Sequence, residues 1–142
     1  MNCLLIVNID GASRGNPGPS AIGIVIAKDN LRVTEHREFI GKKTNNEAEY
    51  AALKKALEIA SKLDNQVTIL SDSQLVVNQR NSRYKVRSKK LKNISREIST
   101  LEGNFKNIVY KHIARVNNVY ADSLANLAID EHNNNKSYYT KA

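Results

Sequence analysis

The sequence predicts an α/β domain in which helices flank a mixed five-stranded sheet. Three apolar runs joined by turn-rich segments open the chain, which is the pattern of antiparallel strands. Two further apolar runs then alternate with stretches of helical periodicity, and strands that alternate with helices usually pair in parallel. The length of 142 residues fits one domain with a core of its own.

The three opening strands are expected at LLIVNI (4–9), AIGIVIA (21–27) and VTEHREFIG (33–41). The first two are continuous apolar runs of the kind found in buried strands, and the third alternates apolar and polar residues. Turn-forming residues fill both connections between these strands, including three Gly and two Pro within residues 8–20. We therefore expect an antiparallel meander.

Helices and strands alternate in the rest of the chain. We expect helices at 44–64, 73–80, 88–103 and 117–130, and strands at 66–72 and 105–114. Thr44 or Asn45 can cap the first of these helices, and Gly103 follows the third as a stop signal. The remaining residues, 131–142, are polar and predict a tail outside the packed domain.

The charge of the chain favours a polyanionic partner. Lys and Arg number 22 against 14 Asp and Glu, which gives a net charge of +8. Six basic residues and no acidic one lie in RYKVRSKKLK (83–92), although a solvated helix face would also explain this run. The absence of Trp and the presence of only two Phe do not favour an aromatic platform for single strands.

The apolar runs are too short for a membrane protein. None approaches the 18 residues of a membrane span, and the N-terminal CLLIVNI lacks the basic flank of a signal peptide. The single cysteine, Cys3, suggests a reducing compartment. We expect a cytoplasmic protein with no membrane partner, and a monomer.

Acidic residues stand at the ends of two predicted strands. Asp10 follows the first strand and Asp72 closes the fourth. Carboxylates at strand ends on one edge of a sheet would face the same crevice, where ligands bind. For either residue alone, a turn-forming Asp is the structural alternative.

Helical periodicity selects one of the two glutamates in the helix predicted at 44–64. Glu49 shares a face with the apolar residues Leu53 and Leu57, whereas Glu47 lies on the opposite side with Lys54. An acid on a buried stripe is costly unless it is paired or coordinated. Glu49 therefore needs a partner, which would be either a cation or a buried salt bridge.

The last predicted helix carries a fourth candidate, Asp122, on the same face as Ala125 and Ile129. Asp10, Glu49, Asp72 and Asp122 lie on elements that could all flank one sheet edge. Four converging carboxylates would repel one another unless cations compensate them. All-oxygen ligands suit Mg²⁺ or Mn²⁺ rather than zinc, and no Cys/His cluster indicates another metal.

Four motifs together resemble type 1 ribonuclease H in its compact archaeal-like form. They are DGASRGNPGP (10–19), TNNEAEY (44–50), SDSQLVVNQ (71–79) and NVYADSLAN (118–126). The resemblance covers roughly residues 3–130 and implies a ribonuclease H-like fold, with a catalytic domain over 1–130 and a polar C-terminal tail at 131–142. It also implies a metal-dependent endonuclease that hydrolyses the RNA strand of RNA–DNA hybrids, leaving 5′-phosphate and 3′-hydroxyl ends.

The same resemblance implies roles for individual residues. The catalytic and metal-binding acids would be Asp10, Glu49, Asp72 and Asp122, holding two Mg²⁺ ions, or Mn²⁺, about 4 Å apart. Contacts to the hybrid would come from Gly11, Ser13, Asn16, Thr44, Asn45, Asn46 and Gln74. For Thr44 and Asn45, helix capping is a second explanation that can coexist with a phosphate contact.

Two departures from the family pattern leave alternatives open. The basic protrusion of longer relatives is absent, and the run at 83–92 is the candidate to replace it. His112 precedes Asp122 at the family's spacing, but the loop ARVNN is shorter than usual. Either His112 assists product release, or it packs in the strand and Arg115 takes that role.

Two other kinds of protein share the predicted fold. A hybrid-binding module with weak catalysis is one, and the four intact acids speak against it. A domain excised from a reverse transcriptase is the other. Met1 lies close to the first predicted strand, which favours a complete short protein.

Overall fold

One sheet contains β1 (Leu5–Ser13), β2 (Gly18–Lys28), β3 (Leu31–Lys43), β4 (Gln66–Ser71) and β5 (Asn107–His112). In the computed structural model, which describes residues 5–82 and 85–140 except for the side chains of 32–33 and 136–140, the strand order is β3-β2-β1-β4-β5. The β1–β2 and β2–β3 pairs are antiparallel, and the β1–β4 and β4–β5 pairs are parallel. The predicted mixed five-stranded sheet is confirmed.

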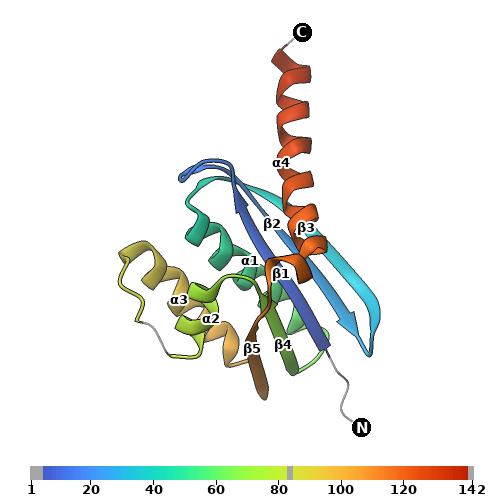
Figure 1. Cartoon of the computed structure of the whole chain (residues 1–142). Helices are drawn as coiled ribbons and strands as arrows, with labels where there is room; N and C mark the ends of the chain where they lie inside the picture. Colours follow the sequence, from blue (N-terminus) through green and yellow to red (C-terminus); the bar gives the residue numbers. More distant parts are fainter. Residues whose placement is uncertain (1–4, 83–84, 141–142) are drawn as a thin grey trace.

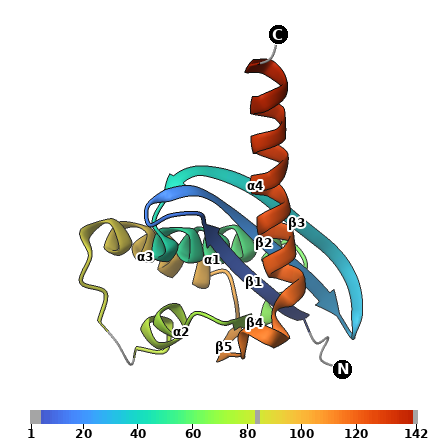
Figure 2. The same cartoon turned by 45° about the horizontal axis from the view of Figure 1, so that its top comes forward.

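Helices cover both faces of this sheet (Figure 1). They are α1 (Asn45–Ala60), α2 (Gln74–Arg80), α3 (Lys89–Glu102) and α4 (Val119–Thr140), and a short 3₁₀ turn at Arg115–Asn117 leads into α4. Figure 2 shows α1 and α3 on one side of the sheet and α4 on the other. Among the described residues, no helix combines the length and the apolar content needed to cross a bilayer.

The first three strands are longer than the apolar runs predict. Gly11 pairs with Ile22, and Ser13 pairs with Ser20, so that residues with turn propensity extend the β1–β2 ladder. Cross-strand hydrogen bonds stabilise such residues in a strand despite their local preference. Only residues 14–17 are left to form the turn.

The main core lies between the sheet and α1. Alternate residues of β1, namely Leu5, Val7 and Ile9, are buried there together with Leu53 and Leu57 of α1. Because neighbouring residues of a strand point to opposite faces, Asn8 and Asp10 are directed to the α4 side. The packing of β1 therefore determines which of its residues can meet α4.

The helix α4 runs to Thr140, so the predicted end at residue 130 is wrong. Arg37 of β3 donates to Glu131 at 2.6 Å, and the His132 ring stacks on Phe39 with centroids 3.6 Å apart. These contacts hold the first turn beyond residue 130 against β3, and no Gly or Pro follows before Thr140 to stop the helix. Figure 1 shows the end of α4 extending past the sheet.

Candidate active site

The acidic site forms where β4 ends beside β1. The parallel ladder of these strands finishes at the pair Ile9 and Ser71, and the next residues of the two strands are Asp10 and Asp72. Strand β1 continues to Ser13, whereas β4 has ended. The two aspartates therefore stand at one level, at the carboxyl end of the parallel strands, where ligands bind in open α/β sheets.

Glu49 reaches this position from α1. The backbone N–H of Gly11 donates a hydrogen bond to Glu49 Oε1. Gly11 lets the helix come this close, because a Cβ atom there would lie 2.2 Å from the carbonyl carbon of Ala48. The glutamate chosen by helical periodicity is thus the one that faces β1.

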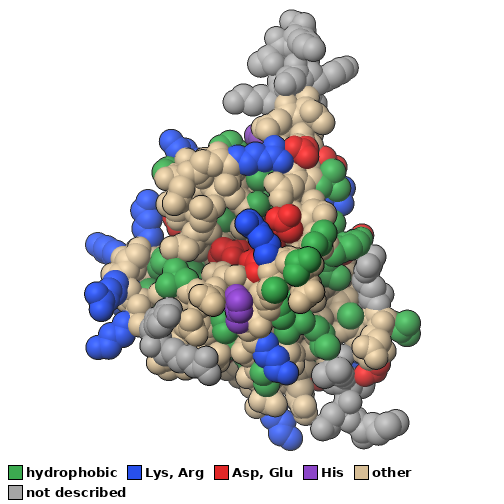
Figure 3. Space-filling view, viewed as in Figure 1, with side chains coloured by type: hydrophobic (Ala, Val, Ile, Leu, Met, Phe, Trp, Pro, Cys, Tyr) green, Lys and Arg blue, Asp and Glu red, His purple; other side chains and the backbone are tan. Residues whose placement is uncertain are grey.

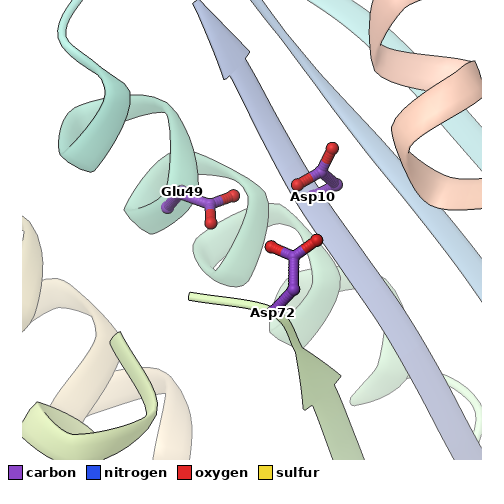
Figure 4. A group of neighbouring side chains, drawn as sticks. All are labelled: Asp10, Glu49 and Asp72. Atoms are coloured by element: carbon purple, nitrogen blue, oxygen red, sulfur yellow. The ribbon is translucent and has the colours of Figure 1, made fainter. Parts of the chain in front are cut away.

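Carboxylate oxygens of Asp10, Glu49 and Asp72 lie within 4.8 Å of one another, the one such acidic group found in the described part of the chain. Figure 4 shows the three side chains directed toward a common point. Asp10 is 6% exposed and Glu49 is 9% exposed. Hard oxygen donors brought together in this way fit a divalent cation such as Mg²⁺ or Mn²⁺.

Burial and mutual repulsion raise the pKa values of two of these acids. Burial above all, together with the nearby charge of Glu49, raises the pKa of Asp10 to about 9. Burial also raises the pKa of Glu49 to about 7, opposed by the Gly11 N–H that favours its charged form. Without a cation, the site therefore disfavours full ionisation of its acids.

Asp122 lies beside Asp10 but outside the group of three. It stands in the first turn of α4. A hydrogen bond between the Asp122 and Asp10 side chains contributes to the raised pKa of Asp10. Asn126 Nδ2 donates to the Asp122 carbonyl at 3.0 Å and to Asp122 Oδ1 at 3.2 Å. The structure thus brings three of the predicted acids together and places the fourth next to them.

Arg115 and His112 occupy different places around the acids. The positive charge of Arg115, in the 3₁₀ turn, lowers the pKa of Glu49. His112 is exposed at the end of β5 and lines a cavity of about 400 Å³ with Gln74 and Asn78 of α2. Figure 3 shows Asp and Glu side chains in a hollow at the centre of this face, with a Lys or Arg side chain and a His side chain nearby.

Hydrogen bonds tie two of the predicted hybrid contacts, Ser13 and Asn16, to neighbouring elements. Ser13 Oγ donates to the Lys43 carbonyl at 2.8 Å, and the Asn45 N–H donates to Asn16 Oδ1 at 3.0 Å. The first bond joins the ends of β1 and β3, and the second joins the turn after β1 to the beginning of α1, where Asn46 is exposed. Gln74 is exposed at the start of α2.

The capping explanation for Thr44 is confirmed. Thr44 Oγ1 accepts from the Glu47 N–H at 3.2 Å, and Glu47 Oε1 accepts from the Thr44 N–H at 3.0 Å. This reciprocal capping box was present in the sequence as Thr44 followed three residues later by Glu47. The role of Glu47 could therefore have been found from the sequence.

The basic run forms an exposed surface around the start of α3. Lys85, Arg87, Lys89, Lys90 and Lys92 are exposed, whereas residues 83–84 of the run lie outside the described residues. Figure 3 shows Lys and Arg side chains gathered over α3, to the left of the acidic hollow. The exposure fits both a solvated face and a surface for phosphates.

We expect the metal-free protein to lose stability as the pH rises. The folded pKa of Asp10, about 9, is far above the ordinary value for an aspartate, 3.8. The folded state therefore retains a proton that the unfolded chain has released, and the free energy of unfolding falls with pH between these values, by at most about 1.4 kcal/mol per pH unit for one proton. Urea unfolding in EDTA at about pH 5 and about pH 8.5 measures the change.

Asp10→Asn is the control for this effect. The variant has no proton to lose at this position, so it should be more stable than the wild type at the higher pH and show a weaker pH dependence. A wild-type stability that rises over this range, or an Asp10→Asn variant with the same pH dependence, would contradict the assignment.

Comparison with known proteins identifies the family. The family model described as "Reverse transcriptase-like" matches residues 8–128. The Bifunctional protein Rv2228c of Mycobacterium tuberculosis is 40% identical over 129 residues, which are 89% of this chain but 35% of that protein. The chain thus spans about a third of the length of this relative.

Two solved structures extend the comparison. RNase H1 of Halobacterium salinarum has a TM-score of 0.87 at 38% identity, covering 90% of this chain and 98% of that one. LC11-RNase H1, solved in complex with an RNA/DNA hybrid, has a TM-score of 0.86 at 38% identity with the same coverage. The chain therefore belongs to the reverse transcriptase-like family and has the fold of a compact type 1 ribonuclease H.

Proposed function

We propose that this chain is a metal-dependent endonuclease that hydrolyses the RNA strand of RNA–DNA hybrids. The observation that carries the proposal is the convergence of Asp10, Glu49 and Asp72 at the carboxyl end of the parallel strands. The relatives support it, because the Halobacterium protein is named Ribonuclease HI and LC11-RNase H1 was solved with an RNA/DNA hybrid.

The acids are the proposed metal ligands. Asp10, Glu49 and Asp72 would hold the ions, with Asp122 completing the set from α4. Two divalent ions in such a site supply a water of lowered pKa and stabilise charge on the leaving oxygen. No protein nucleophile would then be required.

The chain's own residues would orient these ligands and handle the phosphate. The Gly11 N–H holds Glu49, and the Asn126 amide holds Asp122. Arg115 provides a positive charge next to the acids and is our candidate for assisting release of the product phosphate. His112, at the end of β5, is the alternative.

Hybrid binding would use the surface that surrounds the acids. The turn with Asn16 lies against the start of α1, where the helix dipole favours a phosphate. A DNA phosphate would lie near Thr44 and Asn45. The RNA strand would be read by its 2′-hydroxyls, through contacts from Gly11, Ser13, Asn16, Asn46 and Gln74. The lysines of α3 would add backbone contacts without sequence preference.

Other expectations from the sequence stay predictions. They are Mg²⁺ as the physiological ion, two ions per site, a monomeric state, no membrane partner, a cytoplasmic location and the domain limits of 1–130 and 131–142.

A cleavage gel tests the proposed function. Labelled RNA–DNA, RNA–RNA and DNA–DNA duplexes are incubated with Mg²⁺, Mn²⁺ or EDTA. We expect cuts in the RNA strand of the hybrid, with 5′-phosphate and 3′-hydroxyl ends, only when a divalent ion is present. The DNA duplex should stay intact. An uncut hybrid with both metals, or cutting in EDTA, would contradict the proposal.

A further inference from the structure

Asn118 is a buried polar residue at the point where α4 begins. It follows the 3₁₀ turn and is 1% exposed. Its backbone carbonyl accepts a hydrogen bond from the Asp122 N–H at 3.1 Å, so Asn118 begins the helical turn that carries Asp122. A buried amide is costly unless its donors and acceptor are paired, so the contacts of this side chain are informative.

The Asn118 side chain contacts two residues of β1 and one of the clustered acids. Its Nδ2 donates to the Ile9 carbonyl at 2.8 Å and lies 3.5 Å from Asp72 Oδ2. Its Oδ1 accepts from Asn8 Nδ2 at 3.1 Å. Because Asn8 donates to the oxygen, the amide nitrogen must face Ile9 and Asp72, and the orientation of the side chain is determined.

Asp72 is the acid that most needs such a contact. The β1–β4 ladder ends one residue before it, at Ser71, so backbone pairing with β1 no longer holds Asp72 in place. Asp10, in contrast, lies within the continuous β1–β2 ladder, and Glu49 is held by the Gly11 N–H. Asn118 provides the contact to Asp72 from the α4 side.

We propose that Asn118 is a positioning residue that sets the separation of the acids. Through its side chain it orients Asp72 against the end of β1, and through its backbone it starts the turn that places Asp122 beside Asp10. The inference rests on the proposed function for its catalytic consequence, but its effect on metal binding can be measured independently. Partners that orient metal-binding carboxylates typically contribute about 10–100-fold to metal affinity or activity.

The test compares Asn118→Ala with Asn117→Ala, an exposed asparagine at the neighbouring position. Calorimetric titration with Mn²⁺ should show binding weakened about 10-fold or more in Asn118→Ala and unchanged in Asn117→Ala. In hybrid cleavage, kcat should fall about 10–100-fold in Asn118→Ala, while KM for the hybrid stays near the wild-type value. Circular dichroism verifies that each variant is folded at the assay temperature.

Asn8→Ala provides a second variant in case Asn118→Ala does not fold. It leaves Asn118 in place but removes the donor that orients its amide. We therefore expect smaller losses of Mn²⁺ affinity and of kcat than in Asn118→Ala. Wild-type Mn²⁺ affinity and kcat in a folded Asn118→Ala protein, or in Asn8→Ala if the first variant is unfolded, would overturn the proposal. A loss confined to thermal stability would overturn it as well.

The two hypotheses can fail separately. If the wild-type chain binds Mn²⁺ but does not cut the hybrid, the proposed function fails, and the Mn²⁺ titrations of the variants still decide the positioning role. If the wild type cuts the hybrid and Asn118→Ala matches it in kcat and Mn²⁺ affinity, only the positioning role fails.

Discussion

The variants Asp10→Asn, Glu49→Gln, Asp72→Asn and Asp122→Asn should each lose hybrid cleavage by orders of magnitude, at least about 10²–10³-fold in kcat. Each change keeps the size of the side chain and removes one negative charge that a divalent ion needs. Single-turnover cleavage of a labelled RNA–DNA hybrid in Mg²⁺ measures the loss. Near-normal activity in any one variant would remove that residue from the site.

For Asp10→Asn, we expect the loss of activity without a loss of stability. Burial raises the pKa of Asp10 to about 9, so the charge of Asp10 is unfavourable in the metal-free fold. Asp10→Asn should therefore be at least as stable as the wild type in EDTA while being inactive. A variant that is inactive and also unfolded would show a structural defect instead.

Glu47→Gln is the matched control for Glu49→Gln. Both residues lie on α1, but Glu47 caps the helix and Glu49 faces β1. Glutamine can preserve the capping box, so the fold should be retained. We expect kcat near the wild-type value for Glu47→Gln, and an equal loss in both variants would contradict the assignment of Glu49.

The second large effect is expected from Gly11→Ala, which should both destabilise the protein and inactivate it. The new Cβ would lie 2.2 Å from the Ala48 carbonyl carbon and 2.4 Å from the Glu49 backbone nitrogen. Both atoms belong to the backbone of α1, so the helix itself must move away from β1. Overpacking of this kind typically costs about 1–3 kcal/mol.

The cleavage rate should fall together with the free energy of unfolding. Moving α1 displaces Glu49 from Asp10 and weakens the bond from the Gly11 N–H, and a misplacement of about 1 Å can cost about 10²-fold in rate. Urea unfolding and single-turnover cleavage measure the two effects in the same preparation.

Gly103→Ala is the control for a glycine substitution outside the site. Gly103 ends α3 with a φ of −62°, which any residue adopts, and a Cβ there would lie 3.2 Å from the Thr100 carbonyl oxygen. We expect a small change in stability and none in kcat. Wild-type stability and activity in Gly11→Ala would show that α1 adapts without moving Glu49.

The order of strands and helices was predictable from the sequence, and so was the choice of Glu49 over Glu47. Both depend on the local period of apolar residues, which reports the buried face of one element. The apolar run of β4 placed Asp72 at a strand end for the same reason, whereas the expected strand end at Asp10 was wrong, because β1 continues to Ser13. The end of α4 was not predictable, because Phe39 and Arg37, distant in sequence, hold the turn after residue 130.

Only the tertiary structure decided how these elements meet. The register of Ile9 with Ser71 puts Asp10 beside Asp72, and it depends on the whole β1–β4 ladder. The need for Gly11 arises from the α1 backbone, and the contact from Asn118 to Asp72 spans 46 residues. A sequence pattern describes one element at a time, whereas a metal site is defined by distances of a few ångströms between several elements.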